Sequence, residues 1–150
     1  MKLGQKVPTF TLPDQDGKMH SLADYTGKKV LLYFYPKDDT PGCTTEACNF
    51  RDNYKELSKM GLAILGVSKD SVKSHKKFVE KFDLPFPLLS DETGEMVEKY
   101  ESWGKKKFMG REYMGVLRNS FLIDEDGKIA KIYEAVKPAD HVGEVTTDIQ

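Results

Sequence analysis

Two cysteines, Cys43 and Cys48, are the residues whose type and spacing point most directly to chemistry. They are the only cysteines of the chain, and in a reducing compartment such a close pair is more often catalytic or metal-binding than structural. Cys43 follows Thr40 and Pro41, which suit the N-cap and the first position of a helix. A thiol in a first helical turn lies near unpaired N–H groups and the positive end of the helix dipole. Both effects favour the thiolate, so the sequence predicts a reactive Cys43.

The apolar residues after Pro41 separate the two cysteines on a predicted helix over residues 41–59. Cys43 belongs to an apolar stripe at helical spacing. The other members of the stripe are Ala47, Phe50, Tyr54 and Leu57. Cys48 is rotated from Cys43 by about 140°, onto the polar side of the helix. We therefore expect Cys43 at the bottom of a pocket that faces the core, and Cys48 closer to solvent.

The cysteines also have simpler interpretations. Cys43 alone could be a buried apolar residue, and the pair could form a permanent disulfide. So short a loop would contribute only about 2 kcal/mol through chain entropy, and the bond would distort the helix. A structural zinc site needs four ligands, and the histidines show no paired spacing. We expect these histidines, His20, His75 and His141, on the surface, and no metal site.

Two apolar runs frame the predicted helix. Residues 29–35 form a nearly continuous apolar run that ends at Pro36, and residues 62–67 form a second one. Such runs are typical of strands buried on both faces. With the helix between them they form a βαβ unit with parallel strands. Sites in such sheets lie beyond the carboxyl ends of the strands, and the segment 36–43 is at that place.

The remaining segments predict further strands and helices. They are a hairpin over residues 10–22, a helix over 71–82 capped by Ser71, an irregular strand over 84–89, a short helix over 93–100, a hairpin over 116–135 and a last helix from Pro138. Neither an internal repeat nor a linker interrupts them. The economical assembly is one α/β domain over residues 1–150, with a central mixed sheet flanked by helices and an N-terminal β-hairpin.

Charge and hydropathy exclude several classes of protein. The chain has 23 basic and 24 acidic residues and a net charge of −1, so nothing attracts it to nucleic acid or to anionic lipid. The longest apolar run, residues 30–35, is far shorter than the about 20 residues of a membrane-spanning helix. The basic run Lys105–Lys107 is interpreted as a solvated loop. No secretory signal is recognisable, so we expect a cytoplasmic protein.

The segment around the cysteines resembles the peroxiredoxins. Pro36, Thr40 and Cys43 match the family pattern Pro-x-x-x-Thr-x-x-Cys, and Cys48 matches the second cysteine of the PrxQ branch, also called bacterioferritin comigratory protein. Further similar segments are Arg118–Asp124, which resembles the arginine-bearing strand of the family, Trp103-Gly104 and Phe108-Met109-Gly110. The resemblance covers nearly the whole chain and implies a thioredoxin-like fold.

The resemblance also implies a reaction. Cys43 would be the peroxidatic cysteine, whose thiolate attacks hydrogen peroxide or an organic hydroperoxide and becomes a sulfenic acid. Cys48 would resolve the sulfenic acid by forming a disulfide with Cys43. A thioredoxin-type protein would then reduce this disulfide. Neither a metal nor an organic cofactor is needed, and the PrxQ branch leads us to expect a monomer.

Four other residues receive roles from the same resemblance. Thr40 and Arg118 would hold the peroxide and stabilise charge on the departing oxygen, together with the backbone N–H groups near Cys43. Arg118 would also stabilise the Cys43 thiolate. Pro36 would shield the pocket from water, and Glu46 would orient Arg118. Considered without the resemblance, Arg118 could instead bond backbone or a nearby carboxylate.

Two other functions stay open at this point. A thiol–disulfide oxidoreductase is one, although such enzymes use Cys-x-x-Cys and this chain has Cys-x-x-x-x-Cys. A non-enzymatic binding protein or chaperone with a thioredoxin-like fold is the other, because a fold does not by itself specify a function. The discriminating test is the consumption of peroxide with thioredoxin and its reductase, compared with the Cys43→Ser variant.

Overall fold

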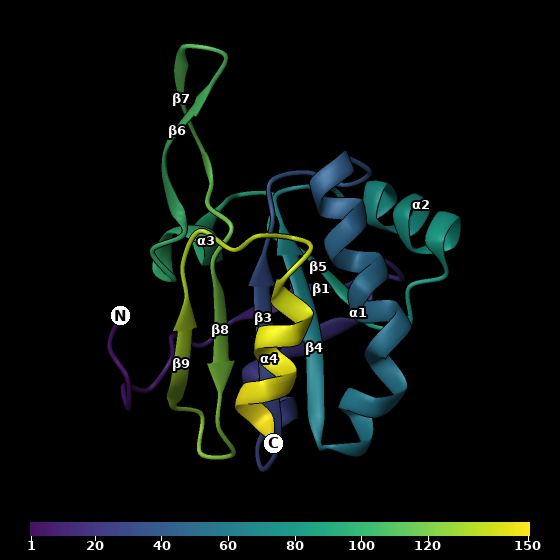
Figure 1. The fold of residues 1–150 in the computed structure, drawn as a ribbon, viewed down its shortest axis with the longest axis vertical. Helices are drawn as coiled ribbons and strands as arrows, with labels where there is room; N and C mark the ends of the chain where they lie inside the picture. Colours follow the sequence, from purple (N-terminus) through teal and green to yellow (C-terminus); the bar gives the residue numbers. More distant parts are fainter.

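The computed structural model describes residues 1–150 and is built around a five-stranded sheet with strand order β5-β4-β3-β8-β9 (Figure 1). In chain order the elements are β1 (Thr11–Pro13), β2 (Met19–Ser21), a short 3-10 helix η1 (Leu22–Tyr25), β3 (Lys29–Phe34), α1 (Pro41–Lys59), β4 (Leu62–Ser68), α2 (Val72–Phe82), β5 (Leu88–Ser90), α3 (Glu95–Lys99), β6 (Trp103–Phe108), β7 (Arg111–Val116), β8 (Ser120–Ile123), β9 (Ile129–Tyr133) and α4 (His141–Ile149).

The sheet is mixed, as predicted. β3 pairs in parallel with β4, and β4 pairs in parallel with β5. β8 runs antiparallel to both β3 and β9. The predicted βαβ unit and the predicted N-terminal hairpin, β1 with β2, are therefore confirmed. Because β3 and β4 point in the same direction, the loop before α1 and the loop before α2 meet at one edge of the sheet.

The alternation of side chains on β3 creates two apolar cores, one on each face of the sheet. Leu31, Tyr33 and Tyr35 pack in one cluster with Phe50 of α1. α1 and α4 cover this face (Figure 1). The neighbouring residues 30, 32 and 34 pack in the second cluster, which includes α3. Burial on both faces explains why β3 has no polar alternation in its sequence.

A protruding hairpin, β6 with β7, was not predicted (Figure 1). The interpretation of Lys105–Lys107 as a loop is wrong, because these residues lie in β6. Most side chains of both strands are exposed, so no burial pattern marks them in the sequence. The irregular strand predicted over 84–89 is also mostly wrong, because only its last two residues belong to β5.

The predicted surface positions of the three histidines are wrong. His20 is 7% exposed, and His75 and His141 are fully buried. Each ring bonds a polar side chain that offsets the cost of burying it. These partners are Asp14, Asp38 and Ser120. The last two pairs lie 37 and 21 residues apart in the chain, so only the tertiary structure brings them together.

The remaining helices follow the sequence pattern. Ser71 caps α2 by accepting a hydrogen bond from the Ser74 amide. α4 begins at His141, three residues after the predicted Pro138, because residues 137–140 form a turn first. None of the helices combines the length and the apolar character that crossing a bilayer requires.

Candidate active site

Cys43 lies in the first turn of α1, beyond the carboxyl end of β3, as predicted. Its side chain is 1% exposed and belongs to the core cluster that α1 covers. Thr40 is the N-cap residue, but its side chain makes no capping hydrogen bond. Its hydroxyl donates to the carbonyl of Lys37 at 2.9 Å. The N–H groups of the first turn, including that of Cys43, therefore have no partner inside the helix and can bind an anionic or polar oxygen.

Arg118 approaches Cys43 from the other side. Its Nη2 lies 3.1 Å from the Cys43 sulfur, and its Nη1 lies 3.5 Å from a carboxylate oxygen of Glu46. Arg118 is in the segment between β7 and β8, so its predicted place within a strand is wrong. Arg118 nevertheless lies next to both Cys43 and Glu46, as predicted. A guanidinium at this distance stabilises a thiolate.

Gly42 makes the approach of Arg118 possible. A Cβ atom at this position would lie 2.8 Å from Nη2 of Arg118, which is shorter than real Cβ contacts. The absence of a side chain at Gly42 thus lets the guanidinium lie over the first turn of α1. The role of Gly42 was not predicted, although its position directly before Cys43 was the available signal in the sequence.

Glu46 is the third ionisable group of the site. It is 1% exposed. Burial raises its pKa to about 7, although the charge of Arg118 acts in the opposite direction. The apolar stripe had not included Glu46, which lies one turn after Cys43 on the same side of α1. Around neutral pH this carboxyl group therefore changes between a neutral form and an anion, which pairs with Nη1 of Arg118 while Nη2 contacts Cys43.

The raised pKa of Glu46 predicts a pH-dependent stability. A carboxyl group with a raised pKa binds its proton more tightly in the folded state, so its contribution to stability is full at about pH 4.5 and is lost as the pH rises to about 7. The loss amounts to roughly 3 kcal/mol. Urea unfolding of the reduced proteins measures this loss. Between about pH 4.5 and 8, the free energy of unfolding of Glu46→Gln should rise relative to that of the wild type by roughly 3 kcal/mol. An unchanged difference between the two proteins across this range contradicts the prediction.

Cys48 lies farther along α1 and is partly exposed, in line with the prediction. Both cysteines are free thiols, so the site is in its reduced state. Pro36 follows β3 and is half-buried, which places it at the same edge of the sheet as Cys43. The structure thus brings Pro36, Thr40, Cys43 and Arg118 together at one edge, with Cys48 outside the pocket.

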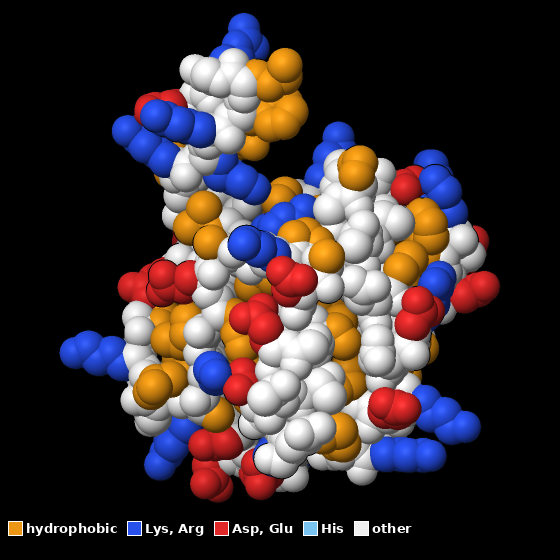
Figure 2. All heavy atoms as spheres, viewed as in Figure 1, with side chains coloured by type: hydrophobic (Ala, Val, Ile, Leu, Met, Phe, Trp, Pro, Cys, Tyr) orange, Lys and Arg blue, Asp and Glu red, His pale blue; other side chains and the backbone are white.

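A basic groove adjoins the site. Its volume is about 620 Å³, and Arg118 lines it together with Lys105, Lys106 and Lys107 of β6. Lys and Arg side chains gather where the hairpin meets the body of the molecule (Figure 2). Burial lowers the pKa of Lys106, with a smaller contribution from Arg118. Glu101 and Glu134 also line the groove, so its charge is mixed, with the basic side chains in excess.

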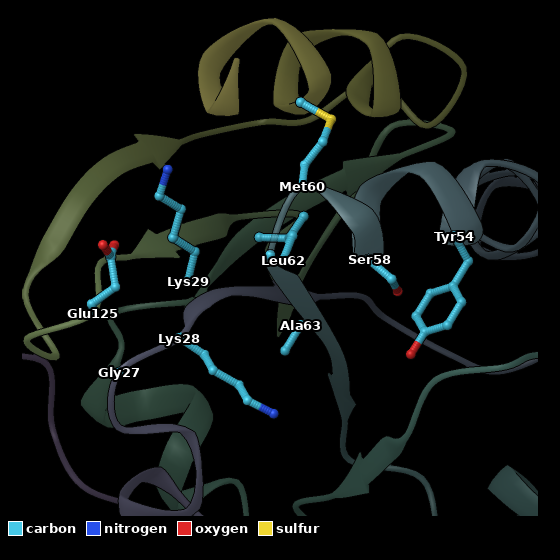
Figure 3. Close-up of a pocket in the computed structure, with 10 residues that line it drawn as sticks. Gly27, Lys28, Lys29, Tyr54, Ser58, Met60, Leu62, Ala63 and Glu125 are labelled. Atoms are coloured by element: carbon cyan, nitrogen blue, oxygen red, sulfur yellow. The ribbon is translucent and has the colours of Figure 1, made fainter.

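A second cavity, of about 460 Å³, lies at the opposite edge of the sheet (Figure 3). Residues that begin β3 and β4, such as Lys29 and Leu62, line it together with Tyr54 from the later part of α1. None of the predicted site residues lines this cavity. The cavity also lies at the amino ends of the parallel strands, whereas ligand sites in open α/β sheets lie beyond the carboxyl ends.

Known proteins resemble this chain in sequence and in fold. The AhpC/TSA family matches residues 3–132. Peroxiredoxin Bcp of Bacillus subtilis is 48% identical over 96% of this chain and 92% of its own, and Peroxiredoxin Bcp of Escherichia coli K12 is 49% identical over 94% and 90%. The solved structure of the Xanthomonas campestris bacterioferritin comigratory protein superposes with a TM-score of 0.91, at 34% identity over 99% of this chain and 97% of the other.

These matches extend over nearly the whole chain and include the segment that carries both cysteines. The solved neighbours confirm the predicted thioredoxin-like fold. The predicted thiol-dependent peroxidase activity is likewise confirmed by the curated relatives, which are peroxiredoxins. The chain therefore belongs to the AhpC/TSA family, and within it to the peroxiredoxins, the thiol-dependent peroxidases of the Bcp and PrxQ kind.

Proposed function

We propose that Cys43 is the peroxidatic cysteine of this peroxidase and that Cys48 is its resolving cysteine. The observation that supports this assignment is the 3.1 Å contact between the Arg118 guanidinium and the Cys43 sulfur. Cys43 is in the first turn of α1 and its sulfur contacts the Arg118 guanidinium, whereas Cys48 lies farther along the helix. Both features stabilise a thiolate, which is the nucleophilic form of cysteine.

The first step consumes the peroxide. The Cys43 thiolate attacks one oxygen of R–O–O–H, a sulfur–oxygen bond forms and the O–O bond breaks. The departing oxygen takes a proton and leaves as water or an alcohol, and Cys43 becomes a sulfenic acid. Arg118 and the N–H groups of the first turn of α1 stabilise the negative charge on the departing oxygen. Thr40 orients the peroxide, and Pro36 keeps water from the sulfur.

The second step resolves the sulfenic acid. The thiol of Cys48 attacks the oxidised sulfur of Cys43, a disulfide forms and water leaves. A dithiol protein of the thioredoxin type then reduces the disulfide and takes up the oxidising equivalents. The substrates are hydrogen peroxide and organic hydroperoxides. The Xanthomonas campestris relative, which is described as reducing alkyl peroxides, supports the organic ones. We further propose that the protein acts as a monomer in the cytoplasm.

A coupled assay tests this function. The reduced protein is mixed with peroxide, thioredoxin, thioredoxin reductase and NADPH, and the oxidation of NADPH is followed. Turnover that requires both peroxide and this chain supports the proposal. A chain that exchanges disulfides with thioredoxin but consumes no peroxide would instead be a thiol–disulfide oxidoreductase, and a chain that does neither would be a binding protein.

Substitution of Arg118 should slow the peroxide step. Arg118→Ala removes a donor that lies on the reacting sulfur, and the loss of one such donor costs about 10²–10³-fold in rate. Gly42→Ala should also slow the reaction. Its methyl group pushes the Arg118 guanidinium away from the Cys43 sulfur without removing the positive charge from the protein. The measurement is the second-order rate constant of the reduced protein with hydrogen peroxide. Arg111→Ala on the exposed hairpin is the control, and equal rates for all four proteins would exclude a role for Arg118.

A further inference from the structure

A buried hydrogen-bond network lies next to the segment that leads into α1. Its centre is the pair formed by His75 of α2 and Asp38 of the loop after β3. Nδ1 of His75 lies 2.7 Å from Oδ2 of Asp38. His75 is fully buried, and Asp38 is 7% exposed. The peroxide mechanism described above uses neither residue.

Asp38 is tied to its own loop, to α2 and to the turn between β4 and α2. Its carboxylate accepts hydrogen bonds from the hydroxyl of Tyr35 at 2.6 Å and from that of Ser74 at 2.8 Å. Its backbone N–H donates to the carboxylate of Asp70 at 2.9 Å, in the turn between β4 and α2. Two hydroxyl groups therefore donate to this carboxyl group, and Asp38 is an anchor inside the protein.

The partners of His75 require both of its ring nitrogens to carry hydrogen. Nε2 lies 3.0 Å from the carbonyl oxygen of Leu89 on β5. A carbonyl only accepts hydrogen bonds, so Nε2 is a donor. Nδ1 faces the carboxylate of Asp38, and two lone pairs at 2.7 Å would repel each other, so Nδ1 is a donor as well. An imidazole with two N–H groups is a cation, and the charge of Asp38 balances it in the core.

The other buried histidine–aspartate pair lacks this requirement. Nε2 of His20 lies 2.7 Å from the carboxylate of Asp14, and its Nδ1 lies 2.7 Å from the hydroxyl of Tyr25. A hydroxyl can donate or accept. A neutral His20 can therefore satisfy both neighbours, whereas a neutral His75 cannot.

We propose that His75 is a positioning residue for the peroxide reaction: as a buried cation it holds Asp38, and Asp38 holds the chain from which the first turn of α1 and Cys43 are built. The inference rests on the proposed role of Cys43. Between the anchor and the helix lie the exposed Asp39 and the half-buried Thr40, and neither side chain reaches the core. Asp38 is thus the last buried attachment of the chain before α1.

The anchor also gives the catalytic cycle a fixed point. When the first turns of α1 open so that the cysteines can meet, residues from Thr40 onward move while Asp38 stays attached to Tyr35, to α2 and to the turn after β4. When the disulfide is reduced, the turn re-forms on the same anchor. Asp38, Asp70 and His75 lie close enough together to be considered as ligands for a cation, but both carboxylate oxygens of Asp38 and both ring nitrogens of His75 already have partners within the protein.

The protonation of His75 can be measured without any variant. In ¹⁵N-histidine-labelled, reduced protein at neutral pH, the ring nitrogens of His75 should both show the signature of N–H groups. A single N–H on His75 overturns the proposal, because the pair would then lack the charge that holds Asp38. This measurement involves neither peroxide nor turnover, so its outcome is independent of the proposed function.

The positioning role predicts a kinetic split. His75→Asn should slow the reaction of reduced protein with hydrogen peroxide by roughly 10–100-fold, the effect of misplacing a reacting group by about 1 Å. The same variant should accelerate disulfide formation after a pulse of peroxide, because a loosened turn opens more easily. Asp38→Asn should give the same pattern, and the double variant should be no worse than either single variant, because the two residues act as a unit.

His20→Asn is the matched control, since it removes a buried histidine that is also bonded to an aspartate. It should lower the free energy of unfolding but leave both rate constants unchanged. If the wild type reacts through Cys43 while His75→Asn keeps both rates, the positioning role is wrong and the proposed function stands. If Cys43→Ser retains the peroxide reaction, the proposed function itself fails.

Discussion

Cys43→Ser should lose peroxide turnover down to the background rate, because a serine hydroxyl in the same pocket is far from ionised and cannot replace a thiolate as nucleophile. Cys48→Ser should behave differently. Its Cys43 keeps the Arg118 contact and the first helical turn, so one equivalent of peroxide should react at the wild-type rate. Turnover should then stop at the sulfenic acid, or continue to the sulfinic acid when peroxide is in excess.

Stopped-flow measurement of peroxide loss, with mass spectrometry of the quenched protein, separates these outcomes. Cys48→Ser should gain one oxygen on Cys43, and Cys43→Ser should gain none in the same interval. The wild type should instead lose two hydrogens as its disulfide forms. Single-turnover reactivity in Cys43→Ser with none in Cys48→Ser would reverse the two assignments.

Oxidation of the wild type should open the beginning of α1. Both cysteines lie on one continuous helix over Pro41–Lys59. Five residues of helix separate the two Cα atoms by about 8.7 Å and rotate the side chains by about 140°. A disulfide needs Cα atoms roughly 4.4–6.8 Å apart. The bond therefore cannot form on the intact helix, and the turns that contain Cys43 and Cys48 must unwind first.

The energetic cost of this opening is modest. Loss of about four helical hydrogen bonds costs about 4 kcal/mol at about 1 kcal/mol each. The open form is therefore thermally accessible in the reduced protein, and the disulfide traps it. Opening disrupts the first turn, whose N–H groups are proposed to hold the peroxide, so we expect the disulfide form to lack a peroxide site until it is reduced.

Hydrogen exchange of the amides from Cys43 to Arg51, in the reduced and disulfide forms, measures the opening. A cost of about 4 kcal/mol corresponds to roughly a thousandfold difference in exchange rate. The amides at the end of α1, from Leu57 to Lys59, lie in the same helix and should change little, which makes them an internal control. Equal protection of residues 43–51 in the two forms would show that the helix stays closed.

Much of the active-site segment could be predicted from the sequence because its determinants are local. A buried strand that ends at Pro36, a favourable N-cap at Thr40 and apolar residues at helical spacing define α1 at its observed bounds, Pro41–Lys59. The helical period alone then turns Cys43 inward and Cys48 outward. These features depend on neighbours within a few residues, so the printed sequence contains them in full.

The contacts around Cys43 depended on the tertiary structure. Arg118 lies 75 residues from Cys43 in the chain, and its segment was predicted as strand although it is a connection. Glu46 looks like an ordinary charged helix residue until the packing of the sheet against α1 buries it and raises its pKa to about 7. A pKa that depends on burial and on a distant charge has no signature in local spacing.

The environment of His75 could not be predicted from the sequence. As a lone histidine on an amphipathic helix it is predicted at the surface, yet it is fully buried between Asp38 and the carbonyl of Leu89. The exposed hairpin β6–β7 was missed for the opposite reason, because strands without a buried face lack an alternating pattern. Local sequence patterns thus place both cysteines on one helix and turn Cys43 inward. The charged groups around Cys43 and its loop come from distant parts of the chain and meet through burial and long-range packing, so local patterns do not contain them.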